Sequence, residues 1–460
     1  MAIPLLPRRR VLIAEPTAAP SNVFSAFAGL PLMGPLYLGT VLKEAGFDVT
    51  VVSENLLGRP LGISDLDYDF LLLSCLTPTV ERGFDIASLF RRRNAAGKVL
   101  MGGQHVTFLP DEALAFADHV VAGEGENVIV DLLRHGSDER VVRGSPVKDL
   151  DALPPVDWDL LVNWRRQYIQ PIMLSRGCPF GCNFCSVTAM FGRAYRTVSV
   201  ERALAEIART TRNDAFFYDD NFTANPKRSF EILEGMLRLR KRPHSWSAQV
   251  RSDVARHEDL VALLARADCG RVYIGMESIN DDALAEMNKG QTAEDVRRAV
   301  KVFHKYGISV HGMFMFGADA DDPETLRATG DFVRREGVDS VQYLISTPFP
   351  GTEYFARLEA EGRLLHKVWR YYDAMHVVFR PKRLSPAQLQ ELAMEQYGDY
   401  YTVRRALQVG VEAPVPRRSR PYRRTARQSI INAGLRFMGS RIVRQWNRGN
   451  ADYFGYLRSV

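Results

Sequence analysis

Ser175-Arg176-Gly177-Cys178-Pro179-Phe180-Gly181-Cys182-Asn183-Phe184-Cys185 contains three of the five cysteines of the chain within eight residues. Gly177, Pro179 and Gly181 allow this loop to curl tightly, because glycine accepts positive φ angles and proline presets its own φ. The loop therefore brings three thiolates together. Clustered cysteines without an even-numbered framework are typical of metal ligation in a reducing compartment and not of disulfides. We therefore expect a cytoplasmic protein.

The number of cysteines in the loop favours an iron–sulfur cluster. Cubane clusters usually take four cysteine ligands, so three would leave one iron open. An open coordination position is typical of a catalytic centre. Zinc is the alternative, but a structural zinc site needs a fourth Cys or His and the loop offers none. The sequence therefore predicts a [4Fe-4S] cluster held by Cys178, Cys182 and Cys185.

Length and composition indicate a globular protein of roughly two or three domains. The chain has 460 residues, of which 46% are hydrophobic and 25% charged. No run approaches the roughly 20 apolar residues of a membrane-spanning helix, and the N-terminus lacks the charged-then-apolar order of a secretory signal. The net charge of +6 is modest and does not indicate nucleic-acid binding.

Residues 1–145 alternate short β-branched runs with helical patterns, which predicts a parallel, doubly wound α/β sheet. Glycines and polar residues follow two of the strands, at 102–105 and 123–125, where such sheets bind ligands. Residues 146–170 are predicted as a linker, because Pro154 and Pro155 cannot continue a helix or a central strand. The predicted strands are Val11–Ala14, Val49–Val52, Phe70–Leu73, Val99–Met101 and Val120–Ala122.

Residues 171–350 contain six further strand-like runs separated by helical patterns, which predicts a partial (β/α)6 barrel. In a barrel the functional groups gather at the C-terminal ends of the strands. The cysteine loop follows the first of these runs. The predicted strands are Ile172–Leu174, Ala215–Tyr218, Ser245–Val250, Val272–Ile274, Val310–Phe316 and Ser340–Ile345.

Two C-terminal segments follow the predicted barrel. Residues 351–412 form a mixed, aromatic-rich extension that we expect to close over it. Residues 413–460 form a basic tail, with ten arginines and no acidic residue between Glu412 and Asp452. Its pattern predicts a basic amphipathic helix, whose apolar stripe docks on its own protein or lies on an anionic membrane. Clustered arginines also suit nucleic acid, but no recognised RNA-binding module accompanies them. The predicted stripe is Ile431, Leu435, Met438, Ile442 and Trp446, with Arg436, Arg441, Arg444 and Arg448 opposite or to the side.

The cysteine spacing, the aromatic Phe184 before the third cysteine, and the position after the first barrel strand resemble the radical S-adenosylmethionine (SAM) superfamily. This resemblance implies that SAM chelates the open iron through its amino and carboxylate groups. It also implies that one electron, from a donor such as flavodoxin or ferredoxin, cleaves SAM to methionine and a 5'-deoxyadenosyl radical, which then abstracts hydrogen from carbon. The protein's task is to orient cofactor and substrate and to exclude water.

The resemblance also implies SAM-binding groups at the ends of the later strands. Carboxylates suit the amino group, an arginine suits the carboxylate, polar side chains suit the ribose hydroxyls, and a glycine lets backbone approach the adenine. For each single residue a solvated strand end or a helix cap is the alternative. The positions are Asp219, Asp220 and Asn221 for the amino group, Gln249 and Arg251 for the carboxylate, Glu277 and Ser278 for the ribose, and His311 and Gly312 for the adenine.

Most of residues 10–145 resembles the cobalamin-binding domain found ahead of many radical SAM barrels. The segments that carry the resemblance are 31–38, 74–79, 102–105 and 123–126. The Asp-x-His-x-x-Gly pattern that supplies a histidine to cobalt is absent, which implies cobalamin bound without that ligand or a related domain without cobalamin. His105 would cap a turn or, alternatively, ligate cobalt. Cys75 and Cys269 are expected in the core, because free cysteine behaves as a small hydrophobe.

The stretch from Gly351 to Pro381 resembles a C-terminal extension of cobalamin-domain radical enzymes that include methylases of hopanoids and bacteriochlorophyll side chains. The leading hypothesis is therefore a cobalamin-dependent radical methyltransferase acting on an unactivated carbon of a small, apolar or lipid-like substrate, with one SAM making the radical and a second remethylating cobalamin. The aromatic residues would line an apolar pocket or form ordinary core. The alternatives are a cobalamin-independent cyclization, rearrangement or oxidation, and a cobalamin- or cluster-bearing sensor.

Overall fold

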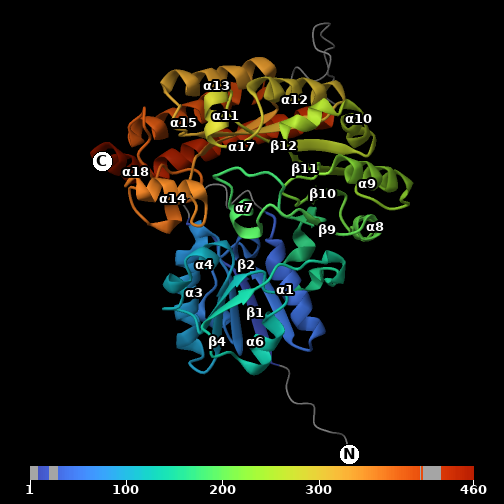
Figure 1. Ribbon diagram of the computed structural model, residues 1–460, viewed down its shortest axis with the longest axis vertical. Coiled ribbons are helices and arrows are strands. Elements are labelled where there is room, and N and C mark those ends of the chain that lie inside the picture. The colour runs from blue at the N-terminus through green and yellow to red at the C-terminus, as the bar shows by residue number, and fades with distance from the viewer. Residues whose placement is uncertain (1–8, 20–28, 405, 408–425) are drawn as a thin grey trace, which may run out of the picture.

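The computed structural model describes residues 9–19, 29–404, 406–407 and 426–460, without the side chains of residues 426–429. It contains two parallel six-stranded sheets, one below the other in Figure 1, with the cysteine loop between them. The first eight residues of the predicted N-terminal domain lie outside the described residues. The predicted basic residues Arg417, Arg418, Arg420, Arg423 and Arg424 also lie outside them.

The N-terminal sheet is doubly wound, as predicted. Its strand order is β2-β1-β3-β4-β5-β6 and every pairing is parallel. Hydrophobic clusters cover both faces, because parallel strands must be buried on both sides. The order reverses between β1 and β3, which is where such sheets bind ligands. The elements are β1 (Arg10–Glu15), α1 (Met33–Glu44), β2 (Asp48–Ser53), α2 (Glu54–Leu57), β3 (Phe70–Ser74), α3 (Val80–Arg93), β4 (Lys98–Gly102), α4 (Gln104–Phe108), α5 (Pro110–Ala113), β5 (His119–Gly123), α6 (Ile129–His135) and β6 (Val141–Gly144).

The second sheet has six parallel strands in chain order, β7-β10-β11-β12-β13-β14. Within the described residues β7 and β14 each pair on one side only, so the sheet is open. Strands β11 and β14 coincide with their predicted runs, whereas β12 begins earlier, at Cys269. The elements are β7 (Ile169–Ile172), α7 (Ser186–Phe191), α8 (Val200–Ala208), β10 (Asp214–Phe217), α9 (Pro226–Arg238), β11 (Ser245–Val250), α10 (Glu258–Arg266), β12 (Cys269–Glu277), α11 (Asp281–Glu286), α12 (Ala293–Lys305), β13 (Ser309–Phe316), α13 (Pro323–Glu336) and β14 (Ser340–Ile345).

Strand alternation gives this sheet two different faces. Val272 and Ile274 of β12 enter the core between the sheet and its covering helices. Arg271 and Tyr273 point to the opposite face, because successive side chains of a strand alternate. We call this opposite face the inner face of the sheet.

The C-terminal extension covers the free edge of β14. The Tyr401 hydroxyl accepts a hydrogen bond from the Val341 N–H at 3.1 Å and donates to the carbonyl of the same residue at 2.6 Å. The Tyr397 hydroxyl accepts from the Tyr343 N–H at 2.9 Å. Side-chain hydroxyls thus satisfy backbone groups that a further strand would pair. The elements are α14 (Glu353–Ala360), α15 (Pro386–Tyr400), α17 (Ala426–Gly449) and α18 (Ala451–Ser459).

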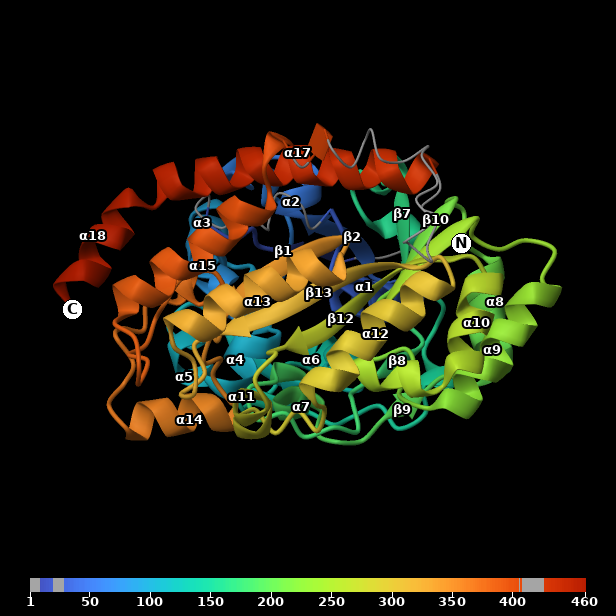
Figure 2. The same cartoon turned by 90° about the horizontal axis from the view of Figure 1, so that it is seen from above.

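The predicted tail helix is present as α17, and it docks on its own protein along the outside of the molecule (Figure 2). It docks mainly through polar side chains. Asn432 is buried between Arg271, which donates to it at 2.7 Å, and Asp339, to which it donates at 3.3 Å. Arg436 is 7% exposed and donates to the Tyr400 hydroxyl at 2.8 Å.

The predicted docking stripe is therefore wrong at Ile431 and Met438 and is confirmed at Trp446, which is 2% exposed. Ile431 and Met438 are exposed, and Leu435 and Ile442 are half-buried. The physical reason is that Arg271 and Asp339 lie in the docking surface and require polar partners once buried. No helix among the described residues is both long enough and apolar enough to cross a bilayer.

We predict that Tyr401→Phe destabilises the protein. The change leaves the Val341 N–H and carbonyl without their partner at a covered sheet edge, which costs about 1–3 kcal/mol. Urea denaturation at neutral pH measures the loss in unfolding free energy. Tyr168→Phe is the matched control, because Tyr168 is 87% exposed. Equal stability of both variants and the wild type would contradict the role of Tyr401 at the edge.

Candidate functional site between the two sheets

The cysteine loop begins and ends at a small two-stranded sheet. β8 (Ser175–Arg176) pairs antiparallel with β9 (Arg196–Thr197) and closes the base of the loop. Gly177 has a φ of +84°, and a Cβ there would lie 2.4 Å from the Ala194 carbonyl oxygen. Only glycine fits this position, so the chain turns directly before Cys178.

Backbone amides point at two of the three thiols. The Phe180 N–H donates to the Cys178 sulfur, and the Val187 and Thr188 N–H groups donate to the Cys185 sulfur. Burial raises the pKa of both thiols, and these donors oppose it. Amide groups that donate hydrogen bonds to sulfur tune thiolates that are bound to iron.

The third thiol, Cys182, is 8% exposed. Cys185 lies close enough to both other cysteines for their charges to interact. Among the described residues, no three His, Cys, Asp or Glu side chains converge on a single metal ion. In a four-iron cluster each thiolate binds a different iron, so its ligands stand apart. The thiols and their donors therefore fit a cluster.

Arg251 is a buried cation that contacts the loop. Its guanidinium carbon lies 3.8 Å from the ring centre of Phe180, and Nη2 donates to the Lys289 carbonyl at 2.5 Å. The side chain is buried, and its Nε has no hydrogen-bond partner, although an Asp253 carboxylate oxygen lies at 3.6 Å. A buried guanidinium N–H without a partner is suited to an anionic group such as the SAM carboxylate.

The three polar residues after β10 have different partners. The Asp219 carboxylate accepts from the Ser175 hydroxyl, and burial raises its pKa to about 7. Asp220 accepts from the Gly177 N–H beside two of the cysteines, and burial raises its pKa to about 6. Asn221 accepts from the N–H and hydroxyl of Thr223 at 3.2 and 3.1 Å. Asp219 and Asn221 thus hydrogen-bond to residues at neighbouring strand ends and turns, whereas Asp220 hydrogen-bonds to the cysteine loop.

The residues predicted for ribose lie at a bulge that ends β12. Glu277 has a φ of +54° and forms a buried ion pair with Lys289 at 2.5 Å. The Ser278 hydroxyl accepts from the Asn280 N–H at 3.0 Å. Gln249 is half-buried on the neighbouring strand. Lys289 therefore already neutralises the Glu277 carboxylate.

The two residues predicted for adenine lie on opposite faces of β13. His311 is on the inner face, where Nδ1 lies 2.8 Å from the Ser340 hydroxyl and Nε2 has no partner. Burial lowers the pKa of His311 to about 3, so the ring is neutral at pH 7. Gly312 faces the helices instead. A Cβ there would lie 3.1 Å from the Met276 sulfur and 3.3 Å from Val338, so core packing accounts for this glycine.

Aromatic rings cross the inner face of the sheet. Phe216 lies 5.6 Å from both Tyr218 and Tyr273 between ring centres, and Tyr273 lies 4.8 Å from His311. We call these four residues the aromatic strip. Phe216, Tyr218 and Tyr273 are only half-buried. Half-buried rings on an inner face supply apolar surface for a ligand.

The carboxyl edge of the N-terminal sheet carries polar atoms without partners. Thr77 Oγ1 and Gln104 Nε2 are buried and make no hydrogen bond. Gly103 has a φ of +97°, and a Cβ there would lie 2.6 Å from the Cys75 carbonyl oxygen. Buried polar atoms without partners, next to the place where Gly103 packs against the backbone of Cys75, fit a large polar cofactor such as cobalamin at this edge.

His105 is fully buried and faces the protein. Its Nε2 lies 3.4 Å from a Glu112 carboxylate oxygen, and its ring packs 4.9 Å from Trp369. Burial lowers the pKa of His105. Its other ring nitrogen, Nδ1, has no hydrogen-bond partner. The Glu112 and Trp369 contacts agree with a packed turn residue. Cys75 and Cys269 are both buried, as predicted.

A buried ion network joins the two sheets at the cysteine loop. Arg176 donates to Glu124 at 2.9 Å and to Glu126 at 2.7 Å, and Arg196 donates to Glu124 at 3.0 Å. Glu124 also accepts from the Val147 N–H at 2.9 Å. Both arginines flank the base of the loop, whereas both glutamates follow β5. The network therefore ties the loop to the carboxyl edge of the N-terminal sheet.

Sequence reasoning missed several of these residues. Arg176 precedes the loop directly, and its position beside Gly177 was a usable signal. Lys289 and Arg196 gave none, because their partners lie 12 and 72 residues away in the chain. Glu15, at the end of β1, was also missed. Burial raises its pKa to about 7, and it lies near Tyr218 of the other sheet.

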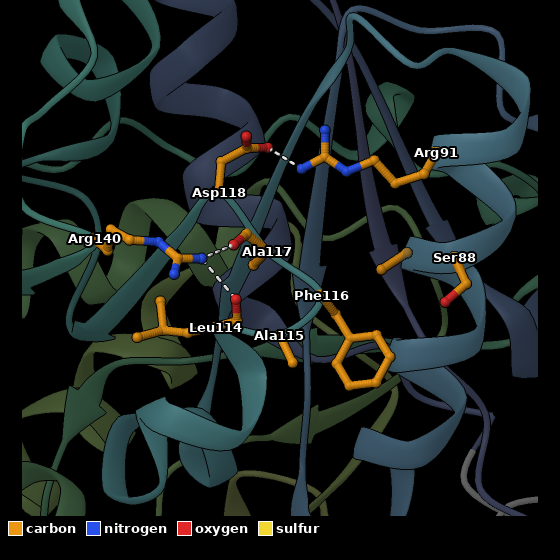
Figure 3. A pocket seen from close by; sticks show the side chains of 9 residues that line it. Ser88, Arg91, Leu114, Ala115, Phe116, Ala117, Asp118 and Arg140 are labelled. Carbon is orange, nitrogen blue, oxygen red and sulfur yellow. Dashed lines mark hydrogen bonds and ion pairs between the residues drawn. The ribbon is translucent and has the colours of Figure 1, made fainter.

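The pocket in Figure 3 lies away from this site. It has a volume of about 530 Å³ and is lined by residues that precede β5 and β6, including Asp118 and Arg140, and by Arg91 of α3. Arg91 pairs with Asp118, and Arg140 donates to the carbonyls of Leu114 and Ala117. Its position at the amino ends of the strands separates it from the cysteine loop.

We predict that Glu124→Gln weakens the docking of the two sheets. Burial raises the pKa of Glu124, but hydrogen bonds from Arg196 and Val147 and the charge of Arg176 outweigh it, so the net shift is downward. The carboxylate therefore stabilises the fold above its unfolded pKa, about 4.3, and this contribution is lost as the pH falls through the lower folded pKa. Removing the charge leaves the largely buried Arg196 without its carboxylate, at about 3–5 kcal/mol.

Urea denaturation between neutral and acid pH measures this effect. The wild type should lose stability below about pH 4, and Glu124→Gln should be weaker at neutral pH and show a smaller acid-dependent loss. Glu231→Gln is the control, because Glu231 is exposed on α9. An unchanged denaturation midpoint in Glu124→Gln would contradict the network's role.

Comparison with known families agrees with this architecture. Residues 172–333 match the model of the radical SAM superfamily, and residues 29–133 match that of the B12 binding domain. The chain is 32% identical over 401 residues to the bacteriochlorophyllide d C-12(1)-methyltransferase of Chlorobaculum tepidum, covering 84% of this chain and 85% of that protein. It is 26% identical to the anaerobic magnesium-protoporphyrin IX monomethyl ester cyclase of Rubrivivax gelatinosus, covering 81% of this chain and 74% of the cyclase.

Among solved structures, the cobalamin-dependent SAM radical enzyme OxsB, with aqua-cobalamin and SAM bound, superimposes with a TM-score of 0.70 at 16% identity. The match covers 94% of this chain and 72% of OxsB, and it shows a common fold. The two matched domains bring a [4Fe-4S] cluster, SAM and cobalamin as cofactors. The chain therefore belongs to the radical SAM superfamily, in the group whose members carry a B12 binding domain ahead of the radical SAM domain.

Proposed function

We propose that this enzyme transfers a methyl group to a carbon of a large, apolar ring substrate. The observation that carries the proposal is the position of the cysteine loop, which is tied to the carboxyl edge of the B12 binding domain and adjoins the strand ends of the radical SAM domain. When bound, the cluster supplies the electron that cleaves SAM, and cobalamin carries the methyl group. The chain's own residues bind, orient and shield these groups.

Cys178, Cys182 and Cys185 are our proposed cluster ligands. The amide donors to Cys178 and Cys185 and the burial of Cys182 support this assignment. Phe184 is half-buried against the hydrophobic core and would support the loop by packing. A flavodoxin or ferredoxin would supply the electron, since the chemistry needs a one-electron donor.

For SAM, Arg251 is our proposed partner of the carboxylate and Asp220 of the amino group. The unpartnered Nε of Arg251 and the direction of Asp220 toward the loop support these roles. Gln249, Ser278 and His311 would complete the site with neutral polar groups. Asp219, Asn221 and the Glu277–Lys289 pair would act by holding the strand ends, because their side chains already have protein partners.

The aromatic strip supports an apolar ring substrate. Its half-buried rings lie on the inner face of the sheet that carries the cysteine loop. The two relatives described above are both named for tetrapyrrole substrates. A planar macrocycle would stack or pack on such rings and exclude water from the reacting carbon.

A second candidate function is an oxidative cyclization. The similarity to the magnesium-protoporphyrin IX monomethyl ester cyclase favours it, since the match with that relative covers 81% of this chain. The two functions differ in whether a labelled methyl group reaches the product.

We predict that Cys182→Ala abolishes the cluster. Loss of one thiolate leaves too few ligands for a stable cubane, so the near-400 nm absorbance after anaerobic reconstitution and the release of 5'-deoxyadenosine should both fall to background. Cys269→Ala is the matched control, because Cys269 is buried but distant in sequence from the loop. Full SAM cleavage by Cys182→Ala would overturn the ligand assignment.

We also predict that methyl transfer requires cobalamin. Protein purified anaerobically with and without hydroxocobalamin is incubated with methyl-labelled SAM and bacteriochlorophyllide d as the probe. The loaded protein should place label in the macrocycle, and the unloaded protein should release 5'-deoxyadenosine without labelling it. A loaded protein that dehydrogenates or cyclizes the probe without label would instead support the cyclase-type function.

A further inference from the structure

Helix α17 presents an unusual outward surface. Ile430, Phe437, Arg441, Arg444 and Arg448 are spaced by seven, four, three and four residues, which places them along one stripe of a helix. All five are exposed. The stripe is apolar in its first half and basic in its second half.

The apolar half is strongly exposed. Ile430 is 71% exposed and Phe437 49%, and the adjacent Ile431 and Met438 are 42% and 46% exposed. Together these four account for much of the exposed large apolar surface of the described chain. Contiguous apolar surface of this kind marks a binding face, because leaving it in water costs free energy.

The basic half has no protein partner within the described residues. Arg441, Arg444 and Arg448 form no ion pair there, in contrast to buried arginines such as Arg176 and Arg363. The opposite side of the same helix is already occupied, since Asn432 and Arg436 dock on Arg271, Asp339 and Tyr400. The outward stripe is therefore available while the helix stays docked.

We propose that the outward stripe of α17 binds the surface of an anionic lipid bilayer. Arginines pair with lipid phosphates, and the neighbouring isoleucines, phenylalanine and methionine enter the boundary between headgroups and acyl chains. Charge complementarity favours this occupant over a second copy of the chain. Two copies meeting through this stripe would set arginines against arginines in a parallel pair, or against apolar side chains in an antiparallel pair. Membrane binding is independent of the proposed reaction. It would place the enzyme where apolar molecules accumulate.

Vesicle flotation of the full chain tests the proposal. The probes are vesicles of phosphatidylcholine alone and of phosphatidylcholine with about one-third phosphatidylglycerol. The wild type should float with the anionic vesicles at about 0.1 M salt, remain unbound with the neutral ones, and dissociate at about 0.5 M salt because the charges are screened.

Two double variants separate the halves of the stripe. Arg441→Gln with Arg444→Gln should weaken partition about 25-fold, roughly five-fold for each arginine. Phe437→Ser with Met438→Ser should weaken it by more than about ten-fold. Ile63→Ser with Arg165→Gln is the matched control, because both residues are exposed elsewhere on the molecule, and it should bind like the wild type.

Each remaining outcome overturns the proposal. Equal flotation with both vesicle types, or unchanged binding in both stripe variants, would exclude an anionic bilayer as the partner. A wild-type dimer in sedimentation velocity that Phe437→Ser with Met438→Ser converts to monomer would assign the stripe to a second copy. Unchanged cluster absorbance in the variants establishes that the comparison is between folded proteins.

Discussion

The buried pairing of Arg176 and Arg196 with Glu124 is the interaction on which the rest of the site depends. The two arginines face each other across the β8–β9 pair at the base of the cysteine loop, and Arg176 reaches Glu126 as well. Taking such charges out of water costs several kcal/mol per ion, which is recovered only when every partner is in place. Because the glutamates follow a strand of the N-terminal sheet and the arginines lie on the β8–β9 pair, the pairing is complete in only one relative position. The network therefore fixes where the loop stands over the carboxyl edge of the B12 binding domain.

Contacts of the residues on either side of Arg176 connect the network to the cysteine loop. Arg176 is followed directly by Gly177, whose positive φ turns the chain and whose N–H is held by Asp220. Ser175, on the other side of Arg176, donates to Asp219. The two carboxylates after β10 thus hold both flanks of the arginine that enters the network. A displacement of the B12 binding domain would therefore move Ser175, Arg176 and Gly177, and with them the start of the cysteine loop.

The sequence predicted what is encoded locally. β-branched runs located every strand of the second sheet to within a few residues, and the cysteine spacing with its glycines indicated a turn that the positive φ of Gly177 confirms. Interaction partners that are distant in sequence could not be predicted. Glu124 was recognised only as part of a motif, because nothing in its neighbourhood indicates an arginine 52 residues later. For α17, counting apolar residues selected the wrong face, since the buried partners Arg271 and Asp339 belong to other strands and loops. Gly312 was read as a ligand contact, whereas it makes room for Met276 and Val338.

Several titratable groups of the site are neutral or paired at pH 7. His311 is neutral at pH 7, because burial lowers its pKa to about 3, and burial raises the pKa of Tyr218 to about 12, so its phenol also stays neutral. Glu277 and Lys289 neutralise each other. Arg251 therefore stands out as a buried cation with an unpartnered N–H beside the loop. The half-buried rings of the aromatic strip give the inner face an apolar surface that accepts apolar ligands, and in the proposed site Arg251 would orient the carboxylate of SAM.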